Sequence, residues 1–383
     1  MKPIRYRFSP NVSPNKIALI KLIDRALLFL MPKPAYQPQV PVKTITITQF
    51  AHIGDLILLM PALKKLKILT NYKINLVVSS QNFSIASKLK FIDKIEIADA
   101  PYFLRGKKGT YFQFIGQLKK IKTDLIFDVR GDLRNNLFIK LFTRHKLFVG
   151  YNVAGGDALL NLVLPYPHGR HITGLVDPLF DYLQLPQINF SVCWHEKDVP
   201  FEVIDDHLFP EDFMVVHLGA GEQSRRWGMH NFAKTIKSLA ETIPVYVLGT
   251  AQDADAGQLK LLNSIPNVTV CIGRYSILQS IYILKKSSVF LGLDSGFSHI
   301  AAMLKKKVFV LFSGTANKDV WRPYNFYDNQ ITFIKRNVPC DCGTGCGKLI
   351  CADNICMTLI SPPEVINLIK IYLSKKASVI NNG

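Results

Sequence analysis

Apolar and polar positions along the chain predict strands and helices in regular alternation from residue 42 onward. Val42–Thr48 (VKTITIT) alternates β-branched and polar side chains, which is typical of a strand. Gly54-Asp55 then opens a predicted helix that continues through Lys67. Three further strands with helical stretches between them are predicted at Ile74–Val78, Ile95–Ile97 and Leu125–Asp128.

A second βα series follows Leu185–Pro210, a less regular, proline-containing stretch that we interpret as an inter-domain connection. Its predicted strands are Phe213–His217, Val245–Leu248, Val268–Ile272, Val289–Leu293 and Val308–Phe312. Strands that alternate with helices form parallel sheets covered on both faces. The pattern predicts an α/β fold with two doubly wound, Rossmann-like domains, residues 43–190 and 191–360, facing each other across a cleft.

The two ends of the chain differ from this pattern. Residues 361–383 are expected to form a closing helix and tail, because Ser361–Lys375 has a capping serine, early prolines and an apolar stripe. Residues 1–42 form a basic extension, with a helical pattern at Ile17–Met31. That helix either lies on an anionic membrane surface, with Lys16, Lys21 and Arg25 near the headgroups, or packs on the main body. It is too short and too charged to span a bilayer.

Composition narrows the class of protein. The chain has 383 residues, 48% of them hydrophobic and 20% charged, as expected for a globular protein of two domains. Its net charge of +19 implies a polyanionic partner: nucleic acid, an anionic membrane face or a phosphorylated substrate. No nucleic-acid-binding motif is present, so we expect no nucleic-acid partner. The odd count of seven cysteines and the lack of a signal-peptide pattern predict a cytoplasmic protein.

The most informative stretch is Phe290–Ala302 (FLGLDSGFSHIAA). An apolar run ends abruptly in Asp294, Ser295 and Gly296, and the apolar stretch that follows contains His299. This pattern predicts a buried strand that feeds a helix through a tight turn. The N–H groups at a helix N-terminus bind anions, so we expect a phosphate there. Ser295 as a helix cap and His299 as a satisfied polar residue would be compatible with that geometry.

A second candidate follows Phe213–His217. Gly219, Ala220 and Gly221 form a loop of small residues, and Arg225-Arg226-Trp227 comes shortly after it. A strand, such a loop and paired arginines would suit a diphosphate clamp. The alternative is a solvated helix start with a packed indole.

Two more candidates lie at strand ends in the first half. Gly54 permits a tight turn, and the Asp55 carboxylate could act as a general base on an alcohol, or only complement a helix dipole. Arg130, Asp132 and Arg134 follow the strand that ends at Asp128. They would suit a polar acceptor, or would form a surface ion pair in a turn.

No metal site or cofactor is predicted. Asp253-Ala254-Asp255 has the Asp-x-Asp form of some metal sites, but it opens a predicted helix. Five cysteines near the C-terminus could ligate zinc, but their spacing lacks paired C-x2-C units, so we expect reduced thiols. These are Cys340, Cys342, Cys346, Cys351 and Cys356.

Taken together, these segments resemble the heptosyltransferases of glycosyltransferase family 9. The segments that carry the resemblance are His52–Lys67 (HIGDLILLMPALKKLK), Asp124–Leu137 (DLIFDVRGDLRNNL), Val215–Ile236, Gly292–Leu304 with Val308–Thr315, and Cys356-Met357 with Ile360–Val365. The likeness extends over roughly residues 43–370. Departures from the family pattern lie in loops at the predicted cleft: Gln49, Ala51-His52, Gly228 and Ser313-Gly314.

The resemblance implies a GT-B architecture and an inverting, metal-independent glycosyltransferase. It implies transfer of heptose from ADP-heptose to a lipopolysaccharide or lipooligosaccharide core acceptor, which is phosphorylated and lipid-linked, at the inner face of the cell membrane. Asp55 would be the base, and Arg225 would contact donor phosphate together with Asp294, Ser295, Gly296 and His299. Two alternatives stay open: transfer of another sugar to a different surface glycan, and a non-enzymatic polyanion-binding protein.

Overall fold

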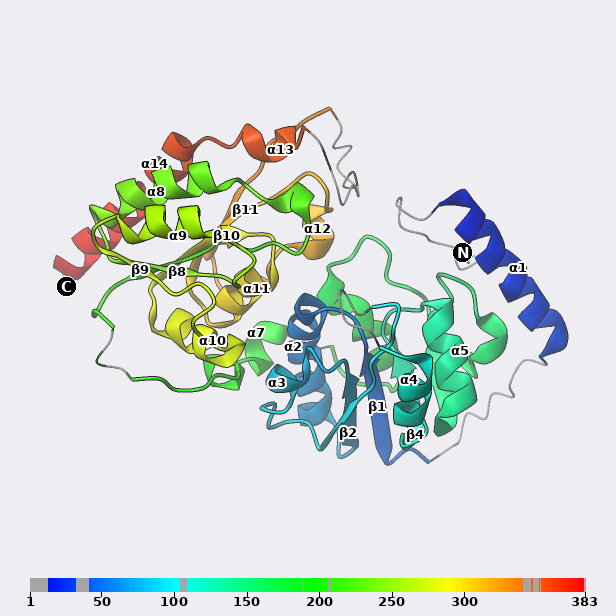
Figure 1. Ribbon diagram of the computed structural model, residues 1–383. Helices are drawn as coiled ribbons and strands as arrows, with labels where there is room; N and C mark the ends of the chain where they lie inside the picture. The colour runs from blue at the N-terminus through cyan, green and yellow to red at the C-terminus, as the bar shows by residue number, and fades with distance from the viewer. Residues whose placement is uncertain are drawn as a thin grey trace. The chain divides into compact units, whose positions relative to one another are not determined.

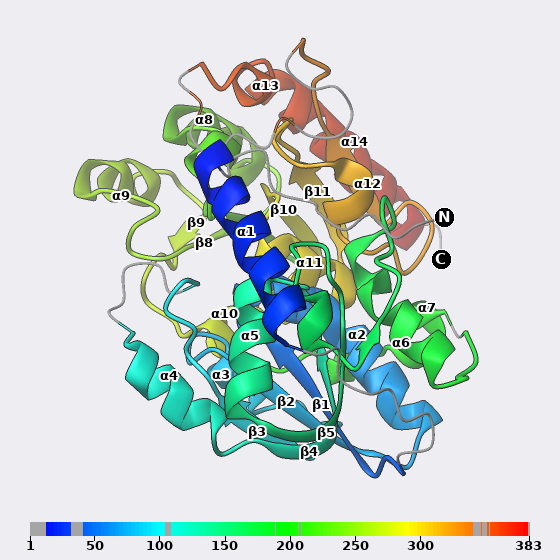
Figure 2. The ribbon, with the colours of Figure 1, turned by 90° about the vertical axis from the view of Figure 1, so that its right-hand side faces the viewer.

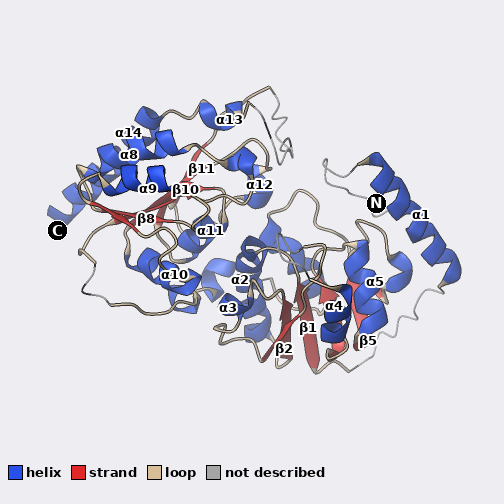
Figure 3. Ribbon diagram, viewed as in Figure 1, coloured by secondary structure: helices blue, strands red, loops and turns tan. Residues whose placement is uncertain are grey.

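The computed structural model describes residues 13–31, 41–103, 109–187, 189–205, 207, 209–339, 346, 351 and 353–381. The chain divides into two compact units, Met1–Trp194 and His195–Gly383. Each unit is built around its own parallel sheet, with helices packed against it (Figure 1, Figure 3).

The first unit contains a six-stranded sheet with the strand order β3-β2-β1-β4-β5-β6, all strands parallel. Its strands are β1 (Thr44–Gln49), β2 (Lys73–Val78), β3 (Lys94–Ile97), β4 (Lys122–Asp128), β5 (Arg144–Gly150) and β6 (Leu162–Val163). Its helices are α1 (Pro14–Leu30), α2 (Ile53–Leu69), α3 (Phe83–Ala86), α4 (Tyr111–Leu118), α5 (Leu133–Phe142), η1 (Asp157–Leu159), η2 (Ile172–Val176), α6 (Asp177–Tyr182) and α7 (Phe190–Cys193).

The second unit repeats this topology with the strand order β12-β11-β10-β7-β8-β9. Its strands are β7 (Met214–His217), β8 (Val245–Leu248), β9 (Val268–Val270), β10 (Val289–Leu293), β11 (Lys307–Leu311) and β12 (Ile331–Ile334). Its helices are η3 (Glu196–Asp198), η5 (Gln223–Arg225), α8 (Met229–Ala240), α9 (Ala256–Asn263), α10 (Ile277–Lys286), α11 (Gly296–Met303), α12 (Lys318–Trp321), α13 (Ile355–Thr358) and α14 (Pro362–Asn381).

The order of strands positions a site in each unit. The order in which successive strands are added across the sheet reverses between the neighbouring strands β1 and β4 in the first unit, and between β7 and β10 in the second. In such sheets ligands bind beyond the carboxyl ends of the strands at this reversal. The central strands are almost completely buried, so only their carboxyl ends and the loops that follow can reach a ligand.

The predicted α/β class with two doubly wound parallel sheets is confirmed. Some elements were not predicted. Strand β5 begins with Arg144, His145 and Lys146, which carry no strand pattern, yet it pairs with β4 along its length. Helix α14 continues to Asn381, six residues beyond the predicted end at Lys375, and packs against α8.

Helix α1 lies against η1, so one side of this N-terminal helix packs on the rest of the first unit. In the described ranges, none of the helices is long and apolar enough to cross a membrane.

Candidate functional site

Asp55 and Arg130 meet at the strand reversal of the first unit. Asp55 lies in the first turn of α2, directly after β1, and Arg130 lies in the loop after β4. Arg130 Nη1 is 3.3 Å from Asp55 Oδ1. The other carboxylate oxygen of Asp55 accepts a hydrogen bond from the backbone N–H of His52, at 3.2 Å. The carboxylate is therefore held from two sides, and it supports its own helix as well as facing Arg130.

The loop between β1 and α2 is fixed by two buried amides. The side-chain oxygen of Gln49 accepts a hydrogen bond from Ala51 N–H. The amide of Asn82 donates to the carbonyl of Ala51 at 2.8 Å. Gly54 lies within the first turn of α2, beside Asp55. The position of Asp55 is thus set by the sheet and by its loop.

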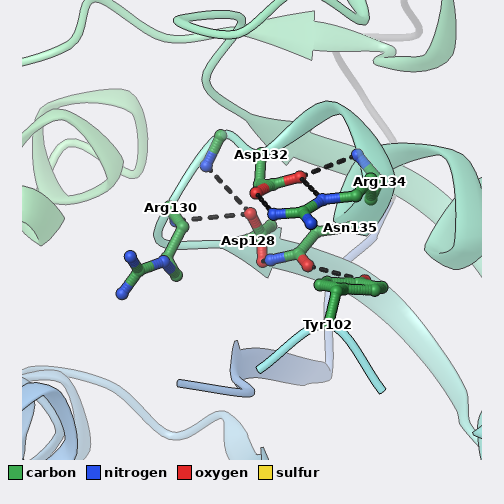
Figure 4. Close-up of polar contacts among 7 residues, drawn as sticks. Tyr102, Asp128, Arg130, Asp132, Arg134 and Asn135 are labelled. Carbon is green, nitrogen blue, oxygen red and sulfur yellow. Dashed lines mark hydrogen bonds and ion pairs between the residues drawn. The ribbon is translucent and has the colours of Figure 1, made fainter. Parts of the chain in front are cut away.

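Asp128 is the buried centre of the loop after β4 (Figure 4). Its Oδ1 accepts hydrogen bonds from Thr48 Oγ1 at 2.8 Å and from the Asn135 amide at 3.0 Å. Its Oδ2 accepts from the backbone N–H groups of Gly131 and Arg130. Asp128 therefore holds the loop that carries Arg130. Burial raises the pKa of Asp128 to about 6, although these hydrogen bonds oppose the rise.

Asp132 and Arg134 form a second pair on the same loop (Figure 4). Arg134 Nε and Nη2 donate to the two oxygens of Asp132 at 3.0 and 2.7 Å. Burial raises the pKa of Asp132, but the hydrogen bonds and charge of Arg134 outweigh it and hold that pKa below its usual value. The predicted surface ion pair is thus present, and its bidentate geometry fixes the guanidinium.

Aromatic rings lie beneath the two arginines. The Arg134 guanidinium is 4.3 Å from the ring centroid of Tyr102, and that of Arg130 is 5.1 Å from Phe103. The hydroxyl of Tyr102 donates to Asn135 at 2.9 Å. The pattern of charged residues did not predict this aromatic layer, because Tyr102 and Phe103 follow β3, far away in sequence.

We expect Asp128 to make folding stability depend on pH. The folded protein holds the Asp128 proton up to about pH 6, whereas the unfolded chain loses it near pH 4. The free energy of unfolding should therefore fall by about 2 kcal/mol as the pH rises from 4 to 6. Asp128→Asn removes this contribution. Urea unfolding of the wild type and the variant at several pH values measures the difference between their free energies of unfolding. If that difference does not change with pH, Asp128 does not have a raised pKa in the folded protein.

In the second unit Arg225 and Asp294 meet at the equivalent reversal. Arg225 ends η5, after β7, and Asp294 follows β10; Arg225 Nη1 lies 3.2 Å from Asp294 Oδ2. The Asp294 side chain is only 3% exposed and that of Arg225 is 30% exposed. Burial raises the pKa of Asp294, and the charge of Arg225 counteracts part of the rise. The guanidinium thus has one buried anionic partner and one open side.

Several buried polar atoms belong to the segments that carry this pair or lead into it. Across the described residues, the Oγ atoms of Ser224 and Ser295 and Nδ1 of His217 are buried without a hydrogen-bond partner. Ser295 occupies the N-cap position of α11, and Gly296 and His299 lie in the first turns of that helix. Buried polar atoms normally have partners, so such a group marks a place where a ligand can supply them.

His217 lines the same region in a neutral form. Its ring stacks on Phe297 at a centroid distance of 4.4 Å. Burial lowers the pKa of His217 to about 4, although the charge of Asp253 opposes this. Neither His217 nor Phe297 was among the predicted site residues. Position alone could have indicated His217, because it is the last residue of a buried strand.

The loop of small residues after β7 approaches its neighbours closely. A Cβ atom at Gly219 would lie 2.7 Å from Asp253 Oδ2, so no larger residue fits there. Ala220 packs against the core, and Gly221 is exposed. A pocket of about 350 Å³ adjoins this loop, lined by residues that include Leu218, Trp227 and Asp253.

Both carboxylates of the Asp-x-Asp segment stabilise local structure. Asp253 Oδ2 accepts hydrogen bonds from the N–H and the hydroxyl of Thr250. Asp255 caps α9 by accepting from Gln258 N–H at 2.8 Å. In the part of the chain that is described, no three His, Cys, Asp or Glu side chains gather as a metal site. Cys340 and Cys342 lie outside the described residues.

Trp227 is packed rather than exposed, as the alternative interpretation of that segment expected. It is buried, its indole N–H donates to the carbonyl of Ile360, and its ring meets Phe232 edge to face. Arg226 is exposed, so the two adjacent arginines point to different surroundings. Only Arg225 of the predicted pair reaches Asp294.

Comparisons with known proteins agree with this architecture. The family model of glycosyltransferase family 9 (heptosyltransferase) matches residues 112–344. No curated protein matches the chain.

Solved structures of family members share the fold. A glycosyltransferase family 9 protein from Veillonella parvula is 16% identical, with a TM-score of 0.68, and the match covers 88% of this chain and 99% of that one. The Escherichia coli heptosyltransferase WaaC with ADP is 13% identical (TM-score 0.64, 85% and 99% covered). The E. coli ADP-heptose LPS heptosyltransferase II is 16% identical (TM-score 0.64, 87% and 99% covered).

Proposed function

The chain belongs to glycosyltransferase family 9 (heptosyltransferase), and from this premise we propose that it transfers heptose from ADP-heptose to a lipopolysaccharide core acceptor. The observation that carries the donor half of the proposal is the Arg225–Asp294 pair beside Ser295, whose buried hydroxyl has no hydrogen-bond partner and lies at the N-cap of α11. Structural relatives support the choice of nucleotide, since E. coli WaaC has been solved with ADP and with an ADP-heptose analogue.

The donor diphosphate would lie against the N-terminus of α11. Ser295 Oγ and the free N–H groups that begin at Gly296 would donate to phosphate oxygens. Arg225 would turn its open side to the diphosphate, and His299 and the loop Gly219–Gly221 would border it. Fixed donors of this kind offset the negative charge that builds up on the leaving nucleoside diphosphate.

Asp55 would act as the base. Its carboxylate would take the proton of an acceptor hydroxyl while that oxygen forms a bond to the anomeric carbon. The bond from this carbon to the diphosphate breaks at the same time, and ADP leaves with the electron pair. Attack from the face opposite the leaving group inverts the anomeric centre, and this route needs no metal ion.

Arg130 and Arg134 would bind the acceptor. A lipopolysaccharide core carries phosphate and carboxylate groups, and guanidinium groups held on aromatic rings recognise such anions well. Asp132 would keep Arg134 in place. The acceptor is anchored in lipid, so we propose that the protein works at the cytoplasmic face of the inner membrane.

A thermal-shift screen of nucleotides and nucleotide sugars tests the proposal. A ligand that binds only the folded protein raises the melting temperature, and a ligand present at 100 times its Kd adds about 2.7 kcal/mol. We expect ADP and ADP-heptose to stabilise the protein more than UDP, GDP and their sugars. Stabilisation by another nucleotide sugar alone would reject the heptose donor, and stabilisation by none would reject the donor site.

A further inference from the structure

Helix α1 presents its acidic residue to the protein and its apolar residues to the outside. Asp24 is completely buried, and its Oδ1 accepts a hydrogen bond from Gly156 N–H at 2.7 Å. Gly155 and Gly156 both have φ near +90°, and a Cβ at Gly155 would lie 2.8 Å from the Asp24 side chain. The glycine loop therefore fits closely around this carboxylate, which fixes the rotation of α1 about its axis.

The opposite side of the helix is an exposed apolar row, which we call the α1 outer row. It consists of Leu19, Leu22, Ile23, Phe29 and Leu30, which are 38 to 89% exposed. Leu22 and Ile23 follow Leu19 by three and four residues, and Phe29 and Leu30 follow them by seven, which places all five on one face of the helix. Globular proteins bury such a row, so its exposure calls for a covering partner.

The charge of the N-terminal segment and of α1 identifies that partner. The first 42 residues contain seven Lys or Arg and a single acidic residue, which is the buried Asp24. Lys16 and Arg25 are exposed on α1 itself. An apolar row bordered by cations, with its only anion turned inward, is complementary to an anionic lipid surface, where side chains enter the acyl boundary and cations meet headgroups.

We propose that the α1 outer row docks the protein onto an anionic bilayer, with α1 lying in the plane of the interface. The helix has 17 residues, or about 26 Å, and it lies along the surface without crossing it. Figure 2 shows the full length of α1 in dark blue.

The attachment of α1 links the bilayer to the acceptor side of the first unit. Gly155 and Gly156 belong to the loop after β5, at the same sheet edge as Arg130. A Cβ at Gly131 would lie 2.6 Å from Tyr151 Cβ, so the Arg130 loop packs directly on that segment. Docking through α1 would hold this edge near a lipid-anchored acceptor, and this consequence alone rests on the proposed function.

Vesicle flotation of the full chain tests the docking. We expect the wild type to float with vesicles of phosphatidylcholine and phosphatidylglycerol, and less with phosphatidylcholine alone. The double variant Leu22→Gln/Phe29→Gln should lower the partition coefficient about tenfold or more, since two apolar side chains are lost from the interface. Both side chains are exposed, so the fold should persist, which circular dichroism checks.

Phe112→Gln is the matched control, because Phe112 is 91% exposed on α4 and Phe29 is 89% exposed on α1. Its flotation should equal that of the wild type. The proposal is overturned if the wild type does not float with anionic vesicles, if the double variant floats as well as the wild type, or if Phe112→Gln loses flotation to the same degree as the double variant. If the wild type does not bind vesicles but sediments as a dimer, and the double variant sediments as a monomer, the α1 outer row would instead contact a second copy of the chain. Thermal shifts induced by nucleotides should be the same in the double variant as in the wild type, because the substitutions lie outside the proposed donor site. A failure of docking can therefore be told apart from a failure of the donor site.

Discussion

Asp55→Asn is expected to lower the turnover number about a thousandfold while leaving donor affinity within a factor of two. A positioned general base typically contributes a hundred- to ten-thousandfold, and asparagine cannot take the proton. The substitution keeps an oxygen that can accept the His52 N–H, so the start of α2 should persist. Single-turnover rates measure the first effect, and calorimetric titration with the donor nucleotide measures the second.

Asp132→Asn serves as the control for charge alone. It removes a carboxylate from the same sheet edge, but one that is already engaged by Arg134 on both oxygens. We expect it to affect acceptor KM more than turnover. If Asp55→Asn turns over at a near-normal rate, or if it loses donor affinity to the same degree as turnover, Asp55 is not the base.

The second large effect is expected for Arg225→Ala, which should raise the Kd for the donor nucleotide roughly ten- to hundredfold. Hydrogen bonds to charged groups contribute about 1.5–3 kcal/mol, and each 1.4 kcal/mol is a factor of ten. The variant also leaves Asp294 buried without its cation, and the pKa of that carboxyl should rise further. Calorimetric titration measures the Kd.

Arg226→Ala is the matched control, since Arg226 is the adjacent residue and is exposed. The two variants lose the same charge, so a nonspecific attraction would weaken equally in both. We expect the Arg226 variant to bind the donor within about twofold of the wild type. Equal losses in the two variants would exclude a specific clamp at Arg225.

Much of the fold could be predicted because its strands are short, continuous apolar runs. Strands β7 (Met214–His217) and β10 (Val289–Leu293) are buried on both faces of their parallel sheet, and their residues carry that apolar pattern. Strand β5 lacks the pattern, because its first half is polar and lies near the surface. Its pairing with β4 decides its structure, and pairing between distant segments leaves no local pattern.

The site was predictable residue by residue, but its pairings were not. Asp55 and Arg130 are 75 positions apart and meet only because β1 and β4 are neighbours in the sheet. Asp128 ends a strand, and charges of alternating sign follow it. That pattern indicated an ion pair at the surface, whereas Asp128 is buried and accepts several hydrogen bonds. The difference comes from Thr48 and Asn135, whose hydrogen bonds to Asp128 depend on the assembled sheet.

The orientation of α1 also required the structure. The sequence pattern left packing on the body and contact with a membrane as alternatives, because Lys21, Asp24 and Arg25 suggest one charged side. In the folded unit Asp24 turns inward and Arg25 outward. A buried hydrogen bond to one backbone N–H selects this rotation, and side-chain periodicity does not reveal it.

The two strand reversals carry the same ion pair with the roles of the two strands exchanged. In the first unit the aspartate follows the first strand and the arginine follows the fourth; in the second unit the arginine follows the first and the aspartate the fourth. Each site cation is therefore locally neutralised, and the excess charge of +19 must reside elsewhere. Salt screens the attraction between this excess charge and an anionic partner over about 8 Å at physiological ionic strength. The residues that would supply this long-range attraction are thus different from the paired residues that would contact the ligand. On the proposed function, we therefore expect capture of an anionic partner and discrimination among ligands to depend on different residues.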